Sequence, residues 1–228
     1  MKPLLLCLLA ACVVSGACRK SAGTGGNSPP EPSPSGANRA TADERTTAES
    51  KPPTNTEARA TLERIYKLAV VFDESRPDSF VAGDFNGDGS GDLAVAVRPA
   101  ADMLGEINNE LANWIVADPR KAIPADPRKA TQTAPPEPGP VKIEQGDTLL
   151  AVVHGHGAEG WRSPEATQSY LLKGVAAQGM RAVPLKTFPP ALEVRSSANL
   201  RADVISGRLA GADGFLYWAR GKYVWRGR

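Results

Sequence analysis

Residues 80–97, FVAGDFNGDGSGDLAVAV, decide the fold class. Two short apolar runs enclose a nine-residue loop that consists almost entirely of Gly, Asp, Asn and Ser. Short apolar runs bounded by such turn-forming residues predict β-strands. We therefore expect one strand over residues 79–83 and a second over residues 92–97, joined by the acidic loop.

The chain on either side of this pair predicts helices first and strands afterwards. Apolar residues from 62 to 69 recur at helical spacing and predict an amphipathic helix that opens the domain near Glu57. The same spacing from Met103 to Trp114 predicts a second helix of about three turns. Further strands are expected over residues 148–153, 169–173, 181–186, 202–206, 214–218 and 223–225, with turns at 212–214 and 220–222. The order predicts one α+β domain over residues 57–228, with a mainly antiparallel sheet that ends in a β-meander.

Residues 117–140 differ in composition from the rest of this domain. The run Ala117–Ala122, ADPRKA, is repeated at residues 125–130, and PPEPGP follows at 135–140. Two short copies are too few to stack as a repeat array. We therefore expect a Pro-rich loop insertion.

The N-terminus has the three parts of a secretory signal. Lys2 supplies the positive charge, residues 4–14 are almost entirely apolar, and small residues lead to Cys18. The apolar part is too short to span a bilayer as a permanent helix. Residues 1–18 resemble a bacterial lipoprotein signal, which implies that residues 1–17 are removed and that Cys18 carries fatty-acyl chains such as palmitate. Cys12 is the alternative lipid site, and a cleaved signal without lipid is a third possibility.

The residues after Cys18 indicate where the protein would be located and how it would be attached. In the lipoprotein family, Asp after the cysteine tends to retain the protein at the inner membrane, so Arg19 implies the outer membrane, facing the periplasm. Residues 19–56 contain no Ile, Leu, Val, Met or aromatic residue. Such a segment buries too little apolar surface to fold. We expect a disordered tether of 38 residues, which would hold the domain about 35 Å from the lipid.

Composition excludes several classes of function. The net charge is only +2, which gives no electrostatic reason to expect a nucleic acid as partner. All three Cys lie within the first 18 residues, and the only His are His154 and His156. Downstream disulfides, thiolate metal sites and cysteine nucleophiles are therefore excluded, and zinc chemistry has few available ligands.

The acidic loop, Asp84–Asp92, has the composition of a calcium site. Ca²⁺ binds six to eight oxygen ligands, and Gly89 allows the tight curl that brings oxygens together. Three carboxylates in so short a loop repel one another unless a cation lies between them. The candidate ligands are the side chains of Asp84, Asn86, Asp88 and Asp92 and the carbonyl of Ser90.

Residues 80–97 resemble the calcium motif of FG-GAP (integrin-alpha-type) repeats, which implies a mostly structural Ca²⁺. The loop differs from an EF-hand, because position 12 is Val95 and strands are expected on both sides. A single copy of the motif does not build a propeller. The alternative is a metal-free turn that joins two strands.

Two further segments contain residue types that could form a site. Residues 149–157, LLAVVHGHG, resemble the oxyanion loop of α/β-hydrolases, but the chain has no Gly-x-Ser-x-Gly motif and no third His for a triad. Trp218, Tyr223 and Trp225 could stack on a glycan such as peptidoglycan, or could form the core of a hairpin. The function expected is a non-enzymatic, calcium-stabilised envelope lipoprotein that binds an unidentified envelope partner or has a structural role. A glycan-binding module is the alternative, and an enzyme that uses His154 or His156 is the third hypothesis.

Overall fold

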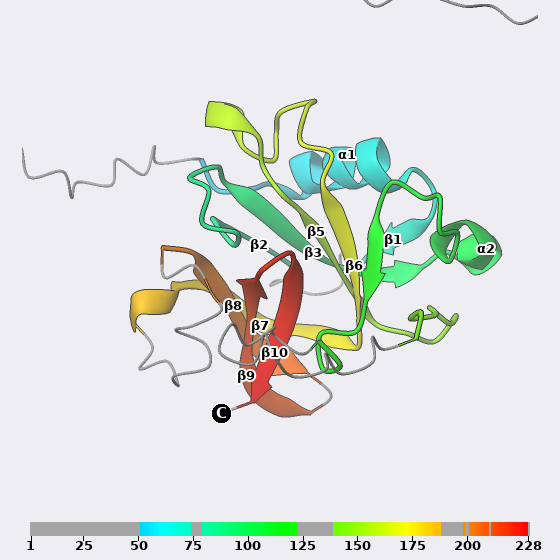
Figure 1. Ribbon diagram of the computed structural model, residues 1–228. Helices are drawn as coiled ribbons and strands as arrows, with labels where there is room; N and C mark the ends of the chain where they lie inside the picture. Colours follow the sequence, from blue (N-terminus) through cyan, green and yellow to red (C-terminus); the bar gives the residue numbers. More distant parts are fainter. Residues whose placement is uncertain are drawn as a thin grey trace, which may run out of the picture. The chain divides into compact units, whose positions relative to one another are not determined.

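The computed structural model describes residues 51–73, 79–122, 139–187, 198, 201–209 and 211–227 (Figure 1). The expected signal, both candidate lipid sites, the tether up to residue 50 and most of the Pro-rich insertion lie outside these residues. The chain divides into two compact units, residues 1–45 and 46–228, and every described residue belongs to the second. All statements below concern that second unit.

The described residues form helices and strands that match the α+β expectation. The helical segments are α1 (Asn55–Tyr66), η1 (Ala101–Met103), α2 (Leu104–Ile107), η3 (Gly157–Glu159) and η4 (Leu185–Thr187). The strands are β1 (Val70–Phe72), β2 (Phe80–Gly83), β3 (Asp92–Pro99), β4 (Ile115–Ala117), β5 (Leu149–Val153), β6 (Ser169–Lys173), β7 (Val175–Pro184), β8 (Asp203–Leu209), β9 (Ala212–Ala219) and β10 (Lys222–Gly227). Among the described residues, no helix has the length and apolar composition needed to cross a membrane.

Sheet 1 contains six strands in the order β1-β3-β5-β6-β4, and β2 also pairs with β3. β2 pairs with the first half of β3 and β1 with its end, so both lie on the same edge of β3. All pairs are antiparallel except β4 with β6. The prediction of a mainly antiparallel sheet is therefore confirmed.

Sheet 2 is the predicted meander, with strand order β10-β9-β8-β7. Ala219 pairs with Lys222, so Arg220 and Gly221 form the turn between them. Both have positive φ, 50° and 86°, as the two central residues of a type I′ hairpin turn require. The turn expected at 212–214 is wrong, because Leu209 pairs with Ala212 and the chain reverses earlier, where Gly211 has φ of 85°. The described residues form neither a closed barrel nor a propeller.

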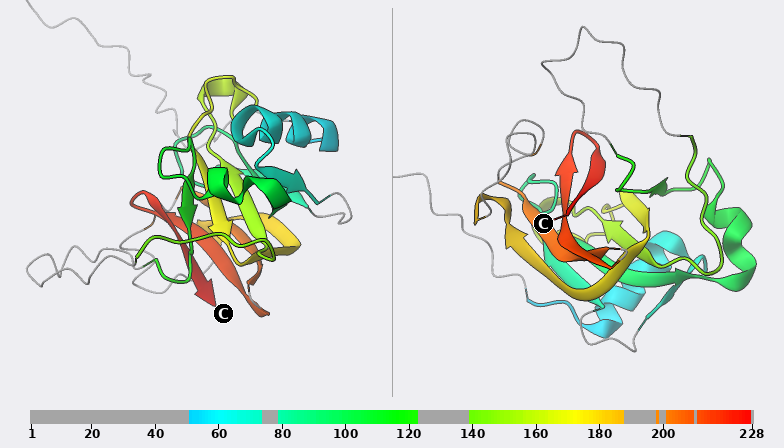
Figure 2. Two further views of the ribbon diagram at one scale, coloured as in Figure 1. Left: turned by 90° about the vertical axis from the view of Figure 1, so that its right-hand side faces the viewer. Right: turned by 90° about the horizontal axis from the view of Figure 1, so that it is seen from below.

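Three layers result: α1, sheet 1 and sheet 2 (Figures 1 and 2). One face of sheet 1 packs against α1, and the other packs against sheet 2. The core on the α1 side includes Leu62, Tyr66, Leu93, Val95, Leu149 and Val153. The core between the sheets includes Ala94, Leu150, Val152, Ile205, Leu216 and Tyr223.

The opening helix begins two residues before Glu57. The Thr54 hydroxyl accepts a hydrogen bond from the Glu57 N–H at 3.2 Å, and the Glu57 carboxylate accepts one from the Thr54 N–H at 3.0 Å. This reciprocal cap satisfies two donors at the helix start and defines the first turn. Apolar side chains at helical spacing then face sheet 1.

The second expected helix is much shorter than three turns. After η1, α2 ends at Ile107. The Asn108 side chain donates to the carbonyls of Leu104 and Ile143, both at 2.9 Å. Leu111, expected on the apolar face, is 90% exposed. Trp114 is buried against Tyr66, with ring centroids 5.5 Å apart. The short strands β1 and β4 were not predicted, and residues 185–187 form η4 instead of continuing a strand.

Candidate cation loop and its surroundings

The acidic loop curls around the carboxylate of Asp84. It connects β2 to β3, and Gly87 and Gly89 have φ of 76° and 93°, which only glycine adopts freely. Asp84 accepts hydrogen bonds from the backbone N–H groups of Gly87 (2.7 Å), Asp88 (3.1 Å) and Gly89 (3.0 Å). The loop backbone therefore surrounds one carboxylate, and burial raises the pKa of that group.

Asn86 and Asp88 form the exposed side of the loop. The Asn86 side-chain amide nitrogen donates to Asp88 Oδ2 at 2.7 Å, and the Asn86 side-chain oxygen Oδ1 accepts from the Asp88 N–H at 3.0 Å. Asp88 Oδ1 accepts from the Ser90 N–H at 2.7 Å. These contacts leave the side chains at the surface, where an ion from solvent can reach them.

Asp92, by contrast, is fully buried. Its Oδ2 accepts from the N–H groups of Phe85 (2.7 Å) and Asn86 (3.3 Å), and its Oδ1 accepts from the Gly155 N–H at 2.7 Å. Burial raises its pKa to about 8, and the charges of Asp84 and Asp88 act in the same direction. Without a counter-charge, this carboxyl therefore favours its protonated form near neutral pH.

The candidate ligands of the loop are all oxygen atoms, which are the ligands that a hard cation such as Ca²⁺ prefers. A carboxylate oxygen that accepts one N–H bond keeps a second lone pair for a ligand. Within the described ranges, however, no three His, Cys, Asp or Glu side chains are gathered as a metal-binding group. Asp92 turns inward, and the Asn86 amide nitrogen donates to Asp88 Oδ2, so one lone pair of that oxygen is already used.

The loop is attached to sheet 2 through Asp203, at the start of β8. The Asp84 N–H donates to Asp203 Oδ2 at 3.0 Å, and the Asp203 N–H donates to the Asp84 carbonyl at 2.7 Å. A residue 119 positions away therefore holds the first residue of the loop. The sequence contains no local signal for this contact.

The glycine-rich segment 154–161 packs on the other side of the loop. The Trp161 N–H donates to the Gly91 carbonyl at 2.7 Å. A Cβ on Gly155 would lie 2.1 Å from that carbonyl oxygen, and a Cβ on Gly160 would lie 2.5 Å from it. The glycines of this segment thus allow two backbones to touch, which sequence patterns did not reveal.

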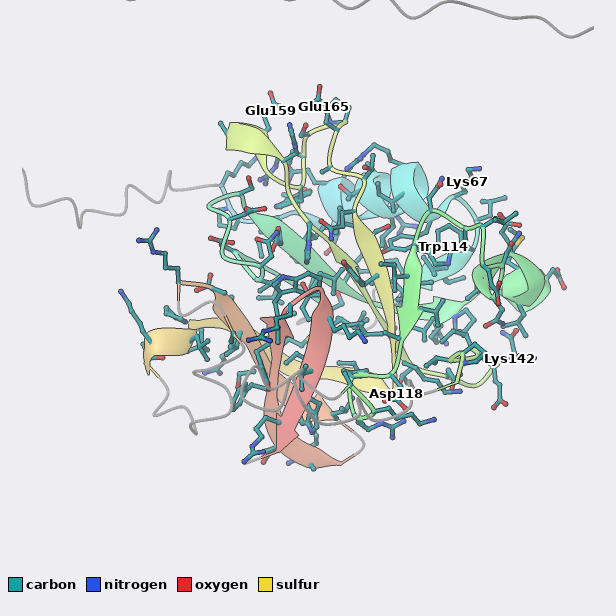
Figure 3. The ribbon with its side chains drawn as sticks, in the orientation of Figure 1. Lys67, Trp114, Asp118, Lys142, Glu159 and Glu165 are labelled. Carbon is teal, nitrogen blue, oxygen red and sulfur yellow. The ribbon has the colours of Figure 1, made fainter. Side chains whose placement is uncertain are left out.

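The two histidines of this segment have different environments. His154 is 2% exposed, and its Nε2 lies 2.7 Å from the Tyr223 hydroxyl. Burial lowers the His154 pKa to about 4, so the ring is neutral at pH 7, and burial keeps the Tyr223 hydroxyl protonated by raising its pKa. His154 Nδ1 meets no hydrogen-bond partner in the described part of the chain. His156 is exposed and pairs with Glu165 at 3.0 Å; Glu165 is labelled in Figure 3.

The C-terminal aromatic residues pack inside the unit and around His154. Tyr223 is 1% exposed, while Trp218 and Trp225 are half-buried against the core between the sheets. The Trp218 ring lies 4.8 Å from the His154 ring and 5.0 Å from the Tyr223 ring. Tyr223 therefore has no open face for a sugar, whereas Trp218 and Trp225 each keep part of their surface exposed.

The structure thus brings the acidic loop, Asp203, segment 154–161 and Tyr223 into one region where the two sheets meet. Of the predicted ligands, Asp84, Asn86 and Asp88 belong to its outer part, and Asp92 to its interior. No protein-family model, curated protein or solved structure matches the chain.

Proposed function

We propose that this chain is a lipid-anchored protein of the bacterial envelope, whose folded part is a calcium-stabilised, non-catalytic binding or structural domain. Cys18, or alternatively Cys12, carries the lipid, which would place the domain at the outer membrane, facing the periplasm. Asp84, Asn86, Asp88 and Asp92, with the carbonyl of Ser90, provide oxygen ligands for Ca²⁺.

The position of the acidic loop is the observation that carries this proposal. The loop closes the β2–β3 hairpin, and its Asp84 bonds to Asp203 of β8. Its other end bonds to segment 154–161, where the Trp161 N–H donates to the Gly91 carbonyl and the Gly155 N–H donates to the Asp92 carboxylate. A cation that ordered the loop would therefore stabilise both sheets. A cation would also favour the ionised form of Asp92, which burial and the nearby carboxylates Asp84 and Asp88 disfavour by raising its pKa.

A structural role for His154 supports the non-catalytic part of the proposal. Its Nε2 is engaged by Tyr223 inside the core, and its neutral ring packs among aromatic side chains. The glycan-binding alternative has less support, because Tyr223 is buried.

Thermal melting with and without calcium tests the domain function. At about a hundredfold excess over Kd, binding to the native state alone adds about 2.7 kcal/mol. A domain of this size should then melt about 5–10 °C higher in calcium than in EDTA. Magnesium should raise the melting temperature less, because it gives up its waters reluctantly.

Asp88→Ala removes an exposed loop carboxylate and should abolish the calcium-dependent shift. Asp102→Ala removes an exposed carboxylate outside the loop and is the matched control, which should keep the shift. If the wild-type melting curves in EDTA and in calcium superimpose, and calcium titration releases no heat, the loop does not bind calcium. The alternative, a metal-free turn that joins two strands, would then be correct. Membrane fractionation of Cys18→Ser beside Cys12→Ser decides which cysteine carries the lipid.

A further inference from the structure

The segment that connects the two sheets at β4 is the first of two nearly identical octapeptides. Residues 115–122, IVADPRKA, form β4 and the turn after it, and residues 123–130, IPADPRKA, follow directly. Seven of the eight positions are identical, and the exception is Val116, which corresponds to Pro124. The structure describes the whole first copy, whereas the second copy lies outside the described residues.

Backbone hydrogen bonds hold the first copy against both sheets. β4 pairs in parallel with β6, with Val116 opposite Leu171. The Pro119 carbonyl accepts a hydrogen bond from the Trp225 N–H of β10 at 2.9 Å. The first copy therefore joins an edge strand of sheet 1 to an edge strand of sheet 2. Because these bonds use main-chain groups, the same bonds are open to another segment with the same conformation.

The turn after β4 is stabilised by residues of the octapeptide itself. The Asp118 side chain is buried at this turn and is labelled in Figure 3. It accepts hydrogen bonds from the Arg120 N–H at 3.0 Å and from the Arg120 guanidinium at 2.9 and 2.8 Å. Both residues recur eight positions later, as Asp126 and Arg128, so the second copy contains the groups that form this turn.

The side chains of the first copy that contact the cores differ from the second copy at one position. Val116 packs against the core on the α1 side, Ala117 against the core between the sheets, and Ala122 against the buried cluster on the outer face of sheet 2. The second copy keeps both alanines and has Pro124 in place of Val116. Pro lacks a backbone N–H, but an edge strand such as β4 tolerates it. This difference makes the second copy the weaker occupant without excluding it.

We propose that the two copies exchange. In the alternative state, residues 123–130 take the place of β4 and its turn, and residues 115–122 form a loop after Trp114. Trp114 keeps its position in both states, because its ring packs on Tyr66 and its indole N–H donates to the Ile107 carbonyl at 3.1 Å. The exchange is a slip by eight residues, which changes the lengths of two connections and leaves the other strand pairs intact.

The lengths of the connections allow the slip. The connection from the turn to Gly139 shortens from 16 residues (123–138) to eight (131–138). Eight extended residues still span up to about 26 Å. The connection after Trp114 gains eight residues, and the entropy cost of a longer loop rises only slowly with its length. The difference between Val116 and Pro124 therefore dominates the balance between the two states.

Melting of charge-reversal variants tests the exchange. The protein is the chain of residues 18–228 with Cys18→Ser, which contains the whole second compact unit. Asp118→Lys places an unpaired cation beside Arg120 at a buried position and should drive the exchange. Asp126→Lys should shift the melting temperature of the parent chain by less than about 1 °C. The same change should lower that of Asp118→Lys by at least about 3 °C, because both copies then carry the unpaired cation.

Asp147→Lys is the matched control outside the octapeptides. Asp147 accepts a hydrogen bond from the Glu144 N–H at 2.7 Å and pairs with Lys173 at 2.8 Å, so its loss destabilises the domain without favouring either copy. Adding Asp126→Lys to Asp147→Lys should change the melting temperature by less than about 1 °C. If Asp118→Lys folds and the double variant with Asp126→Lys does not, the proposal is also supported.

A reporter thiol gives a second measurement. The chain of residues 18–228 with Cys18→Ser contains no Cys, so Ala125→Cys introduces a single thiol. Its labelling by a thiol reagent should slow at least about threefold when Asp118→Lys is added, because position 125 then takes the half-buried place of Ala117. Adding Asp147→Lys should leave the labelling rate unchanged.

The proposal is overturned if Asp126→Lys shifts the melting temperature equally in the parent chain and in Asp118→Lys. Equal labelling rates of Ala125→Cys with and without Asp118→Lys overturn it as well. Both measurements are made in EDTA on a chain without the lipid-bearing cysteine. The loop and anchor experiments above therefore fail or succeed independently of this one.

Discussion

Sheet 1 and sheet 2 bury their strands to different extents. In sheet 1, every residue of β5 is buried, as is β3 from Asp92 to Val97. In sheet 2, only Tyr223 and Val224 of β10 are buried, and the ends of the strand carry Lys222 and Arg226. Sheet 1 has this pattern because α1 covers one face and sheet 2 covers the other.

This difference in burial shows that the order of apolar and charged residues along a strand depends on where the strand lies in the layers. A strand covered on both faces is apolar at consecutive positions, as in LLAVV of β5. A strand at the edge of an outer sheet mixes apolar and charged residues, as in KYVWRG of β10. Both strands pack into the core between the sheets, but β5 is central in its sheet and β10 lies at an edge. The outer face of sheet 2 is itself covered in part, because Val204, Phe215, Tyr217 and Val224 are buried there against Leu185.

The largest expected effect comes from Leu149→Ala and Leu150→Ala. These neighbours are 1% and 0% exposed and face opposite sides of sheet 1. Each substitution should lower the free energy of unfolding by about 3–4 kcal/mol, because each leaves a cavity in a separate core. Chemical denaturation measures both.

Lys186→Ala, at an exposed position of η4 directly after β7, is the control and should change the free energy of unfolding by less than about 0.5 kcal/mol. If only one of the two Leu variants were destabilised, sheet 1 would have an open face. The contrast between the sheets would then be wrong.

The contact between His154 and Tyr223 predicts a loss of stability in acid. The folded-state pKa of His154 is about 4, below its usual 6.5, so between these values the unfolded chain binds more protons than the folded chain. The neutral His154 therefore adds to the free energy of unfolding above pH 6.5. This contribution decreases as the pH falls from 6.5 toward 4. The loss is about 3 kcal/mol.

Comparison with His154→Gln isolates this contribution, because Asp92, with its pKa raised to about 8, changes stability with the opposite sign over the same range. The difference in melting between wild type and variant should shrink as the pH falls from 7 to 4.5. All curves are measured in EDTA. His156→Gln removes an exposed pair with Glu165 and should differ from the wild type by less than about 1 kcal/mol at every pH. A pH-independent difference for His154→Gln would contradict the assignment.

The smallest of these effects concerns Gly155, where segment 154–161 meets the acidic loop. Gly155→Ala places a Cβ against the Gly91 carbonyl and should lower the free energy of unfolding by about 2 kcal/mol, because backbone must move to make room. Gly105→Ala is the matched control. It lies in α2 with nothing within 4 Å of its Cβ position, and should be neutral or slightly stabilising. Equal effects at the two glycines would mean that the contact between loop and segment is loose.

Much of the fold followed from local patterns. β2, β3, β5 and β6 were predicted within one or two residues, because apolar runs between turn residues are local signals. The opening helix was predicted too, but it begins two residues before Glu57 and ends at Tyr66, three residues before residue 69. β1 and β4 have three residues each and were missed, since so short a run has no detectable period. The second helix was overestimated: α2 ends at Ile107, and the Asn108 side chain then bonds to the Ile143 carbonyl, 35 positions away.

The candidate site could be predicted only in part. The order of Asp, Asn and Gly in residues 84–92 identifies the loop, because oxygen ligands and glycine turns are properties of neighbouring residues. The burial of Asp92 and its hydrogen bond from Gly155 join residues 63 positions apart. No local pattern contains that information.

The amino-acid sequence by itself determined the α+β class, the acidic loop between two strands and the residue types available for chemistry. Only the tertiary structure decided which of those residues meet. Tyr223 reaches His154, Asp203 holds Asp84, and Arg181 shares a row with Arg226, all through strand pairing and sheet packing. The physical reason is that hydrogen-bond register and layer order are set by the whole core, whereas turns, caps and periodicity are set within a few residues.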